Sequence, residues 1–170
     1  MDRIIQLHRD LGIPDSYRDA CKLPLYIEPD DLVDTEPDYY QRPQKLTRAA
    51  HEAWLSMSQA ARLDGLNLLL ISAFRGLDYQ RDLIEKKLAQ GQQITDILKV
   101  IAAPGYSEHH SGRAVDLSTD NCRALEVEFE KTPAYQWLNK RARGFGFTLS
   151  FPEDNPYGIT YEPWHWCFQV

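Results

Sequence analysis

Two polar segments of this chain place histidines and carboxylates among apolar residues, and any fold has to accommodate both. The first, SEHHSGRAVD, spaces His109 and Asp116 seven residues apart. The second, EPWH, places Glu162 three positions before His165. A carboxylate surrounded by apolar neighbours stays charged most readily beside a metal ion that histidines also bind. The sequence therefore predicts a fold in which the two segments meet.

The residue types in these segments match the needs of a zinc hydrolase, which uses three nitrogen or oxygen ligands and a carboxylate beside an open position. His109, Asp116 and His165 are the candidate ligands, and Glu162 is the candidate general base. No HExxH sequence is present, so the helical zincin layout does not apply. Taken singly, these residues could be a structural histidine, a buried carboxylate or a charge at a strand edge. Their combination favours the metal.

Composition excludes several other classes of protein. A net charge of −6 and the absence of a basic stripe argue against nucleic acid as the main partner. The N-terminus has no apolar run longer than Ile4-Ile5, so neither a signal peptide nor a membrane span is expected. The three cysteines are odd in number and lack CxxC spacing, which argues against a disulfide framework. A cytoplasmic monomer fits best, and a periplasmic protein would fit if a leader had been removed.

Hydrophobic spacing predicts one α+β domain. Apolar residues recur at three- and four-residue steps between Gln44 and Asp64, and Gly65 follows as a stop signal. LNLLLISA is short, apolar and bounded by turn residues, which is typical of a buried strand. The same reasoning predicts helices over 44–64, 77–90, 94–102 and 132–144, allows one over 4–11, and predicts strands over 66–73, around 114–117, 147–151 and 161–170, the last two paired as a hairpin.

The chain is expected to divide at about residue 42. Residues 1–42 contain several prolines and an acidic stretch from Glu28 to Asp38, which favour an extended segment packed on the domain surface. Residues 43–170 contain the periodic elements and both polar segments. They are therefore expected to form the catalytic domain.

Together the two segments resemble the paired signature of zinc D-Ala-D-Ala carboxypeptidases of the VanY type. The similarity covers about residues 68–168 and includes SAFRGLDYQ and TYEPWHW. It implies a Hedgehog/DD-peptidase-like fold in which a small antiparallel sheet carries one Zn²⁺ ion and helices pack on it. It also implies that His109, Asp116 and His165 bind the zinc and that Glu162 is the catalytic base.

The resemblance further implies a substrate site for peptidoglycan stem peptides that end in a D-amino acid. Arg75 and Ser107 would hold the terminal carboxylate, while Gln80 and Trp164 are weaker candidates for substrate contact. A planar guanidinium can bind a carboxylate bidentately, which would select a free C-terminus. The bland alternatives are a surface ion pair for Arg75, a turn for Ser107 and a core position for Trp164.

The motifs leave the reaction open among related activities. An L,D-carboxypeptidase, a D-Ala-D-Ala dipeptidase, a phage-type endopeptidase and a non-catalytic zinc-binding interaction module all remain compatible with them. Two neighbouring positions carry separate expectations. His110 should be exposed, because adjacent strand residues point to opposite faces, and Cys167 should be a buried strand thiol.

Overall fold

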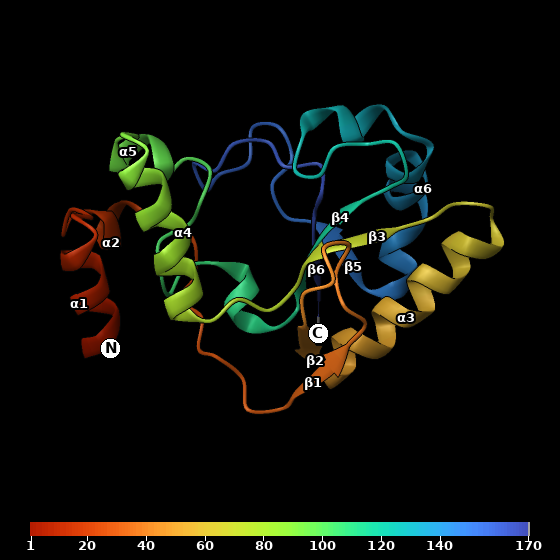
Figure 1. Ribbon diagram of the computed structural model, residues 1–170, viewed down its shortest axis with the longest axis horizontal. Coiled ribbons are helices and arrows are strands. Elements are labelled where there is room, and N and C mark those ends of the chain that lie inside the picture. The colour runs from red at the N-terminus through yellow and green to blue at the C-terminus, as the bar shows by residue number, and fades with distance from the viewer. Residues whose placement is uncertain (170) are drawn as a thin grey trace.

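A four-stranded antiparallel sheet lies at the centre of the protein, for which a computed structural model describes residues 1–169 (Figure 1). Val170, the last residue of the predicted C-terminal strand, lies outside the described residues. The strand order is β3-β4-β6-β5, with β3 at Leu69–Ser72, β4 at Ala114–Ser118, β5 at Phe147–Leu149 and β6 at His165–Phe168. The α+β class and the β5–β6 pairing are as predicted.

Two helices and the central sheet enclose the main hydrophobic core. Helix α3 (Arg48–Leu63) and helix α6 (Pro133–Arg141) contribute Trp54, Met57 and Leu138, all almost fully buried. Thr132 caps α6 by accepting a hydrogen bond from the Tyr135 amide, as its position before Pro133 predicts. Figure 1 shows both helices on the same side of the molecule, at the right.

The predicted helix over 44–64 begins four residues late, because Gln44–Thr47 forms strand β2. β2 pairs antiparallel with β1 (Leu32–Thr35), and the Thr47 hydroxyl then caps α3. Apolar spacing alone does not register this exchange, since Leu46 is fully buried in the strand just as it would be in a helix. The prediction was therefore wrong at the helix start.

A second hydrophobic cluster lies at the left of Figure 1, among α1 (Asp2–Asp10), α2 (Tyr17–Ala20), α4 (Leu77–Ala89) and α5 (Ile94–Ile97). The first 42 residues thus contain two helices and strand β1, and the expectation of an extended segment was wrong for those parts. Helix α5 is also shorter than the predicted 94–102. His8 on α1 is buried and hydrogen-bonds the carbonyl of Pro104, 2.8 Å away.

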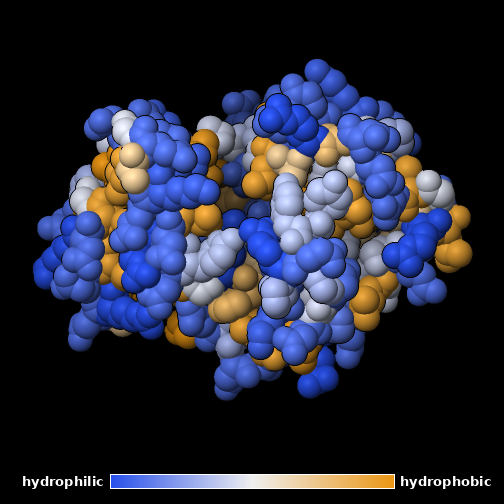
Figure 2. Space-filling model, in the orientation of Figure 1, coloured by the Kyte–Doolittle hydropathy of each residue, from blue (hydrophilic) through white to orange (hydrophobic). Residues whose placement is uncertain are grey.

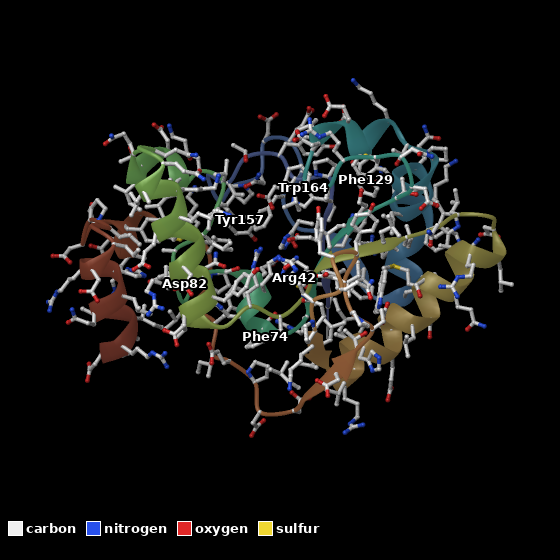
Figure 3. All side chains as sticks on the ribbon, viewed as in Figure 1. Arg42, Phe74, Asp82, Phe129, Tyr157 and Trp164 are labelled. Atoms are coloured by element: carbon white, nitrogen blue, oxygen red, sulfur yellow. The ribbon has the colours of Figure 1, made fainter. Side chains whose placement is uncertain are left out.

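A cleft separates the two clusters, and Figure 2 shows the surface hollowed between them. It has a volume of about 490 Å³ and receives side chains from α4, from the sheet and from the turn η1 (Glu108–Ser111). Figure 3 shows Arg42 and Trp164 on the sheet side of this region and Asp82 on α4 across from them. No helix within residues 1–169 is long and apolar enough to cross a membrane.

Candidate active site

Strand pairing brings the two polar segments together at the cleft. β4 and β6 run antiparallel with Asp116 directly opposite His165. Turn η1 precedes β4, and Gly112 ends it in a left-handed conformation at φ 64° that glycine adopts without strain. This bend places His109 against both residues. His109 Nε2 lies 3.2 Å from Asp116 Oδ2, and His165 Nδ1 lies 3.1 Å from Asp116 Oδ1.

The three side chains fit a metal ion. Their ligand atoms all lie within 4.8 Å of one another, and all three residues are buried. Two ligands of a tetrahedral zinc with bonds of about 2.0 Å are about 3.3 Å apart, close to the separations of both histidines from Asp116. Within the described chain, His109 Nε2 is buried and makes no hydrogen bond. An unpartnered nitrogen beside a carboxylate is what a metal ligand provides, so the cluster is suited to zinc.

The other ring nitrogen of each histidine is held by the protein. His109 Nδ1 donates to the carbonyl of Ala73 at 2.6 Å, and His165 Nε2 donates to Glu108 Oε2 at 2.8 Å. Such contacts fix the tautomer and the ring orientation of metal-binding histidines. They direct His109 Nε2 and His165 Nδ1 toward Asp116. Glu108 was missed in the sequence, because its partner His165 lies 57 positions away.

Burial and charge act against each other in this cluster. Burial lowers the pKa of His109 to about 4, and Arg75 adds to the effect. Burial opposes a charge on His165 as well, but hydrogen bonds to Asp116 and Glu108 outweigh it and raise the pKa of His165 well above its usual range. Burial likewise disfavours the Asp116 carboxylate, yet His109 and His165 hold its pKa well below the ordinary value. These opposing effects favour a proton on His165 over one on His109.

Glu162 lies beside the three ligand residues, but it is farther from His165 Nδ1 than Asp116 is. Its Oε2 is 3.8 Å from His165 Nδ1, and its side chain lines the cleft. Burial raises the pKa of Glu162 to about 7, with Asp116 adding to the rise and His165 opposing it. A carboxylate with such a pKa can accept and return a proton near neutral pH.

Arg75 reaches the same point from the end of β3. Its Nη1 lies 3.6 Å from Asp116 Oδ2, its side chain is largely buried, and its Nε makes no hydrogen bond within residues 1–169. The Arg75 carbonyl accepts a hydrogen bond from His110 Nδ1 at 2.5 Å, and His110 Nε2 accepts one from the Gly105 amide at 3.1 Å. The expectation that His110 is exposed was wrong, because η1 is a 3₁₀ turn rather than a strand.

The remaining candidates divide into two groups. Ser107 and Trp164 line the cleft together with the metal cluster, Glu162 and Arg75. Gln80 is not among the lining residues. Its side chain is buried on α4 and donates to the carbonyl of Ala102 at 2.8 Å, a contact that holds the loop before Ser107. Cys167 is buried on β6, as expected.

Comparison with known proteins identifies the family of this chain. Residues 43–170 match the family described as VanY: D-alanyl-D-alanine carboxypeptidase. YodJ of Bacillus subtilis (strain 168), named a carboxypeptidase, is 33% identical over 152 residues, which cover 84% of this chain and 55% of that protein. A D-alanyl-D-alanine carboxypeptidase of Enterococcus faecalis is 31% identical over 119 residues, covering 64% of this chain and 42% of that protein. The chain thus spans about half the length of these curated relatives.

Solved structures extend the likeness to the fold. The LdcB LD-carboxypeptidase superposes with a TM-score of 0.75 at 27% identity, covering 85% of this chain and 71% of that one. A variant of the vancomycin resistance D,D-pentapeptidase VanY, in complex with Zn(II), superposes with a TM-score of 0.63 at 25% identity, covering 84% and 82%. The family match includes the whole predicted metal site and its base. The chain belongs to the VanY family of D-alanyl-D-alanine carboxypeptidases.

Proposed function

We propose that this protein is a zinc-dependent carboxypeptidase that removes a C-terminal D-amino acid, D-alanine in the first instance, from peptidoglycan stem peptides. The observation that carries the proposal is the shared location of Arg75, Glu162 and the His109–Asp116–His165 cluster in one cleft. A guanidinium that binds a terminal carboxylate would place the last peptide bond of the substrate beside the metal, which suits hydrolysis of that bond. The family membership and the Zn(II) complex of a VanY relative support the same reaction.

The residues divide the chemistry among themselves. His109, Asp116 and His165 hold the zinc, which when bound supplies a Lewis acid that polarises a carbonyl and lowers the pKa of water toward about 7. Glu162 takes a proton from the attacking water and returns it to the departing amine. Arg75 and Ser107, which both line the cleft, fix the carboxylate of the leaving residue. Trp164 lines the cleft where the substrate chain lies.

Mass spectrometry of synthetic stem peptides tests this assignment. The panel contains D-Ala-D-Ala, L-Lys-D-Ala and meso-diaminopimelyl-D-Ala ends, each as the free acid and as the C-terminal amide. The zinc-loaded protein should release one residue from a free acid, spare the amide and lose activity on chelation. Equal cleavage of acid and amide would contradict the role of Arg75. Zinc binding near one equivalent without cleavage of any peptide would favour a non-catalytic zinc module.

The same panel separates the related activities. An L,D-carboxypeptidase is the second candidate, because the LdcB LD-carboxypeptidase shares 27% identity and a TM-score of 0.75 with this chain. Such an enzyme would cleave the L-Lys-D-Ala and diaminopimelyl-D-Ala ends in preference to D-Ala-D-Ala. Cleavage of the free D-Ala-D-Ala dipeptide, added to the panel, would indicate a dipeptidase, and cleavage of internal bonds an endopeptidase.

A further inference from the structure

A second cavity adjoins the catalytic cleft. It has a volume of about 650 Å³ and lies between the Tyr39–Tyr40 pair and the loop that follows β4. The cavity and the cleft share three lining residues, Tyr40, Ile71 and Ala124. The two spaces therefore lie side by side with a shared wall, and together we call them the groove; the metal cluster lines the cleft only.

The tyrosine pair is exposed on a backbone that is held firmly. Tyr39 and Tyr40 are 59% and 54% exposed, and their rings meet edge to face at 5.2 Å. Beneath them Asp38 is 1% exposed, and its carboxylate accepts hydrogen bonds from the Tyr40 amide at 2.8 Å and from Arg42 Nε at 2.7 Å. Two more donors bond the same carboxylate, the Arg42 amide and the Gln44 side chain.

Further contacts tie this loop to the sheet. The Tyr39 amide donates to the Leu70 carbonyl on β3 at 2.8 Å, and Arg42 Nη2 donates to the Ile71 carbonyl at 2.9 Å. The Arg42 guanidinium also lies over the Tyr40 ring, 5.1 Å from its centre. Large aromatic rings presented on a preorganised backbone bind ligands with little loss of conformational entropy. We call Tyr39 and Tyr40 the tyrosine platform.

The direction of the groove follows from β3. Arg75 lies beyond the C-terminal end of β3, whereas the second cavity is lined by Leu69 at its beginning. On β4, Asp116 pairs with Ser72, and Thr119 at the second cavity follows three residues later. A substrate whose terminal carboxylate binds Arg75 and whose scissile bond lies at the metal cluster would then extend toward the platform. Three strand residues span about 10 Å, comparable with the reach of three or four extended peptide residues.

We propose that the second cavity binds the amino sugar to which a stem peptide is attached, with the tyrosine platform stacking against the sugar. This inference rests on the proposed function, because it takes the polarity of the groove from the role of Arg75. The wall opposite the platform offers side chains that match sugar hydroxyl and acetamido groups, namely Asp120, Asn121, Arg123 and Glu126. Apolar ring faces combined with a few polar groups are typical of a ligand site.

A pair of substrates that differ only in the sugar tests the inference. The wild-type protein should cleave N-acetylmuramyl-pentapeptide with a kcat/KM about fivefold above that of the free pentapeptide, in line with the energy of one aromatic contact. In Tyr39→Ala the ratio of the two kcat/KM values should fall toward one. Tyr39→Phe, which keeps the ring, should retain the ratio, and so should Leu63→Ala, which removes an exposed apolar side chain on α3 outside both cavities.

Calorimetric binding of the same two peptides to zinc-loaded Glu162→Gln protein separates this inference from the proposed function. Tighter binding of the muramyl peptide without cleavage by the wild type would support the sugar site and contradict the carboxypeptidase. Equal binding, together with equal kcat/KM, would overturn the sugar site. An equal loss on both substrates in Tyr39→Ala would overturn it as well, because it would indicate a general effect on the fold.

Discussion

The metal cluster and the tyrosine platform are both built around buried carboxylates, but they use them differently. At the cluster, Asp116 and Glu108 contact the functional histidines themselves, so the orientation of each side chain is fixed. At the platform, Asp38 holds the backbone, while the tyrosine rings remain more than half exposed. Bond-making chemistry requires fixed atoms, whereas recognition of a large ligand requires only a fixed surface. Substitutions at the cluster should therefore lower zinc binding and kcat/KM. Substitutions at the platform should lower the preference for the muramyl peptide.

The largest effect is expected from removing a ligand of the cluster. His109→Ala should bind far less than one equivalent of zinc and should lose about 10³-fold or more in kcat/KM, since the metal contributes several kcal/mol to such reactions. Metal analysis after gel filtration and a D-alanine release assay measure both quantities. His51→Ala, on α3 away from the cleft, serves as the histidine control. Retention of zinc and activity in His109→Ala would show that His109 is not a ligand of a catalytic zinc.

A smaller loss is expected when the support of a ligand is removed. Glu108→Ala should weaken zinc binding about 10- to 100-fold, because the His165 ring loses the acceptor that orients it. Glu108→Gln, which keeps an acceptor oxygen, should recover much of the affinity. Competition with a chromophoric chelator gives the zinc dissociation constants. The proposed support by Glu108 would be wrong if the alanine and glutamine variants bound zinc as tightly as the wild type.

The pH dependence of zinc binding tests the electrostatics of the cluster. In the metal-free protein the raised pKa of His165 keeps that ring protonated at neutral pH, whereas His109 is neutral. Zinc must displace the His165 proton, so its affinity should rise with pH by about tenfold per unit between pH 6 and 7.5. Competition titrations corrected for protonation of the chelator measure the slope. A flat profile would mean that no proton is released.

The smallest effect is expected at the rim of the cleft. Val100 lines the catalytic cleft and is 41% exposed, and Val127 is 43% exposed but lines neither cavity. Val100→Ala should raise KM by about two- to threefold through lost apolar contact, while Val127→Ala should leave KM unchanged. In urea denaturation, the free energy of unfolding of each variant should lie within about 0.5 kcal/mol of the wild-type value. A fall in kcat for Val100→Ala would contradict this prediction, because it would show that the rim of the cleft affects the chemical step.

The metal cluster could be predicted from the sequence because its chemistry is confined to a few residue types in short motifs. His109, Asp116 and His165 converge as expected, and Glu162 and Arg75 line the same cleft. The strands that carry Asp116 and His165 were also predicted, since apolar runs between turn residues indicate a buried strand. These features depend on local sequence.

The predictions that were wrong or missing concern residues whose surroundings are set by contacts between distant segments. His110 was predicted to be exposed from strand alternation, but a 3₁₀ turn directs its ring to the Arg75 carbonyl. Glu108 has no local signal, because its role is set by His165 across the sheet. The tyrosine platform also lacks a local signal, because Arg42 fixes its loop by donating to the Ile71 carbonyl on β3, 29 positions along the chain. Neither hydrophobic spacing nor a family motif carries that information.

We propose that Glu162 is the base of a zinc-dependent carboxypeptidase. The most direct measurement is D-alanine release from a stem pentapeptide by Glu162→Gln and wild-type proteins matched for zinc content. Loss of the base should lower kcat by about 10²- to 10⁴-fold while zinc stoichiometry stays near that of the wild type. Near-normal kcat in a zinc-loaded Glu162→Gln protein would show that Glu162 is not the base.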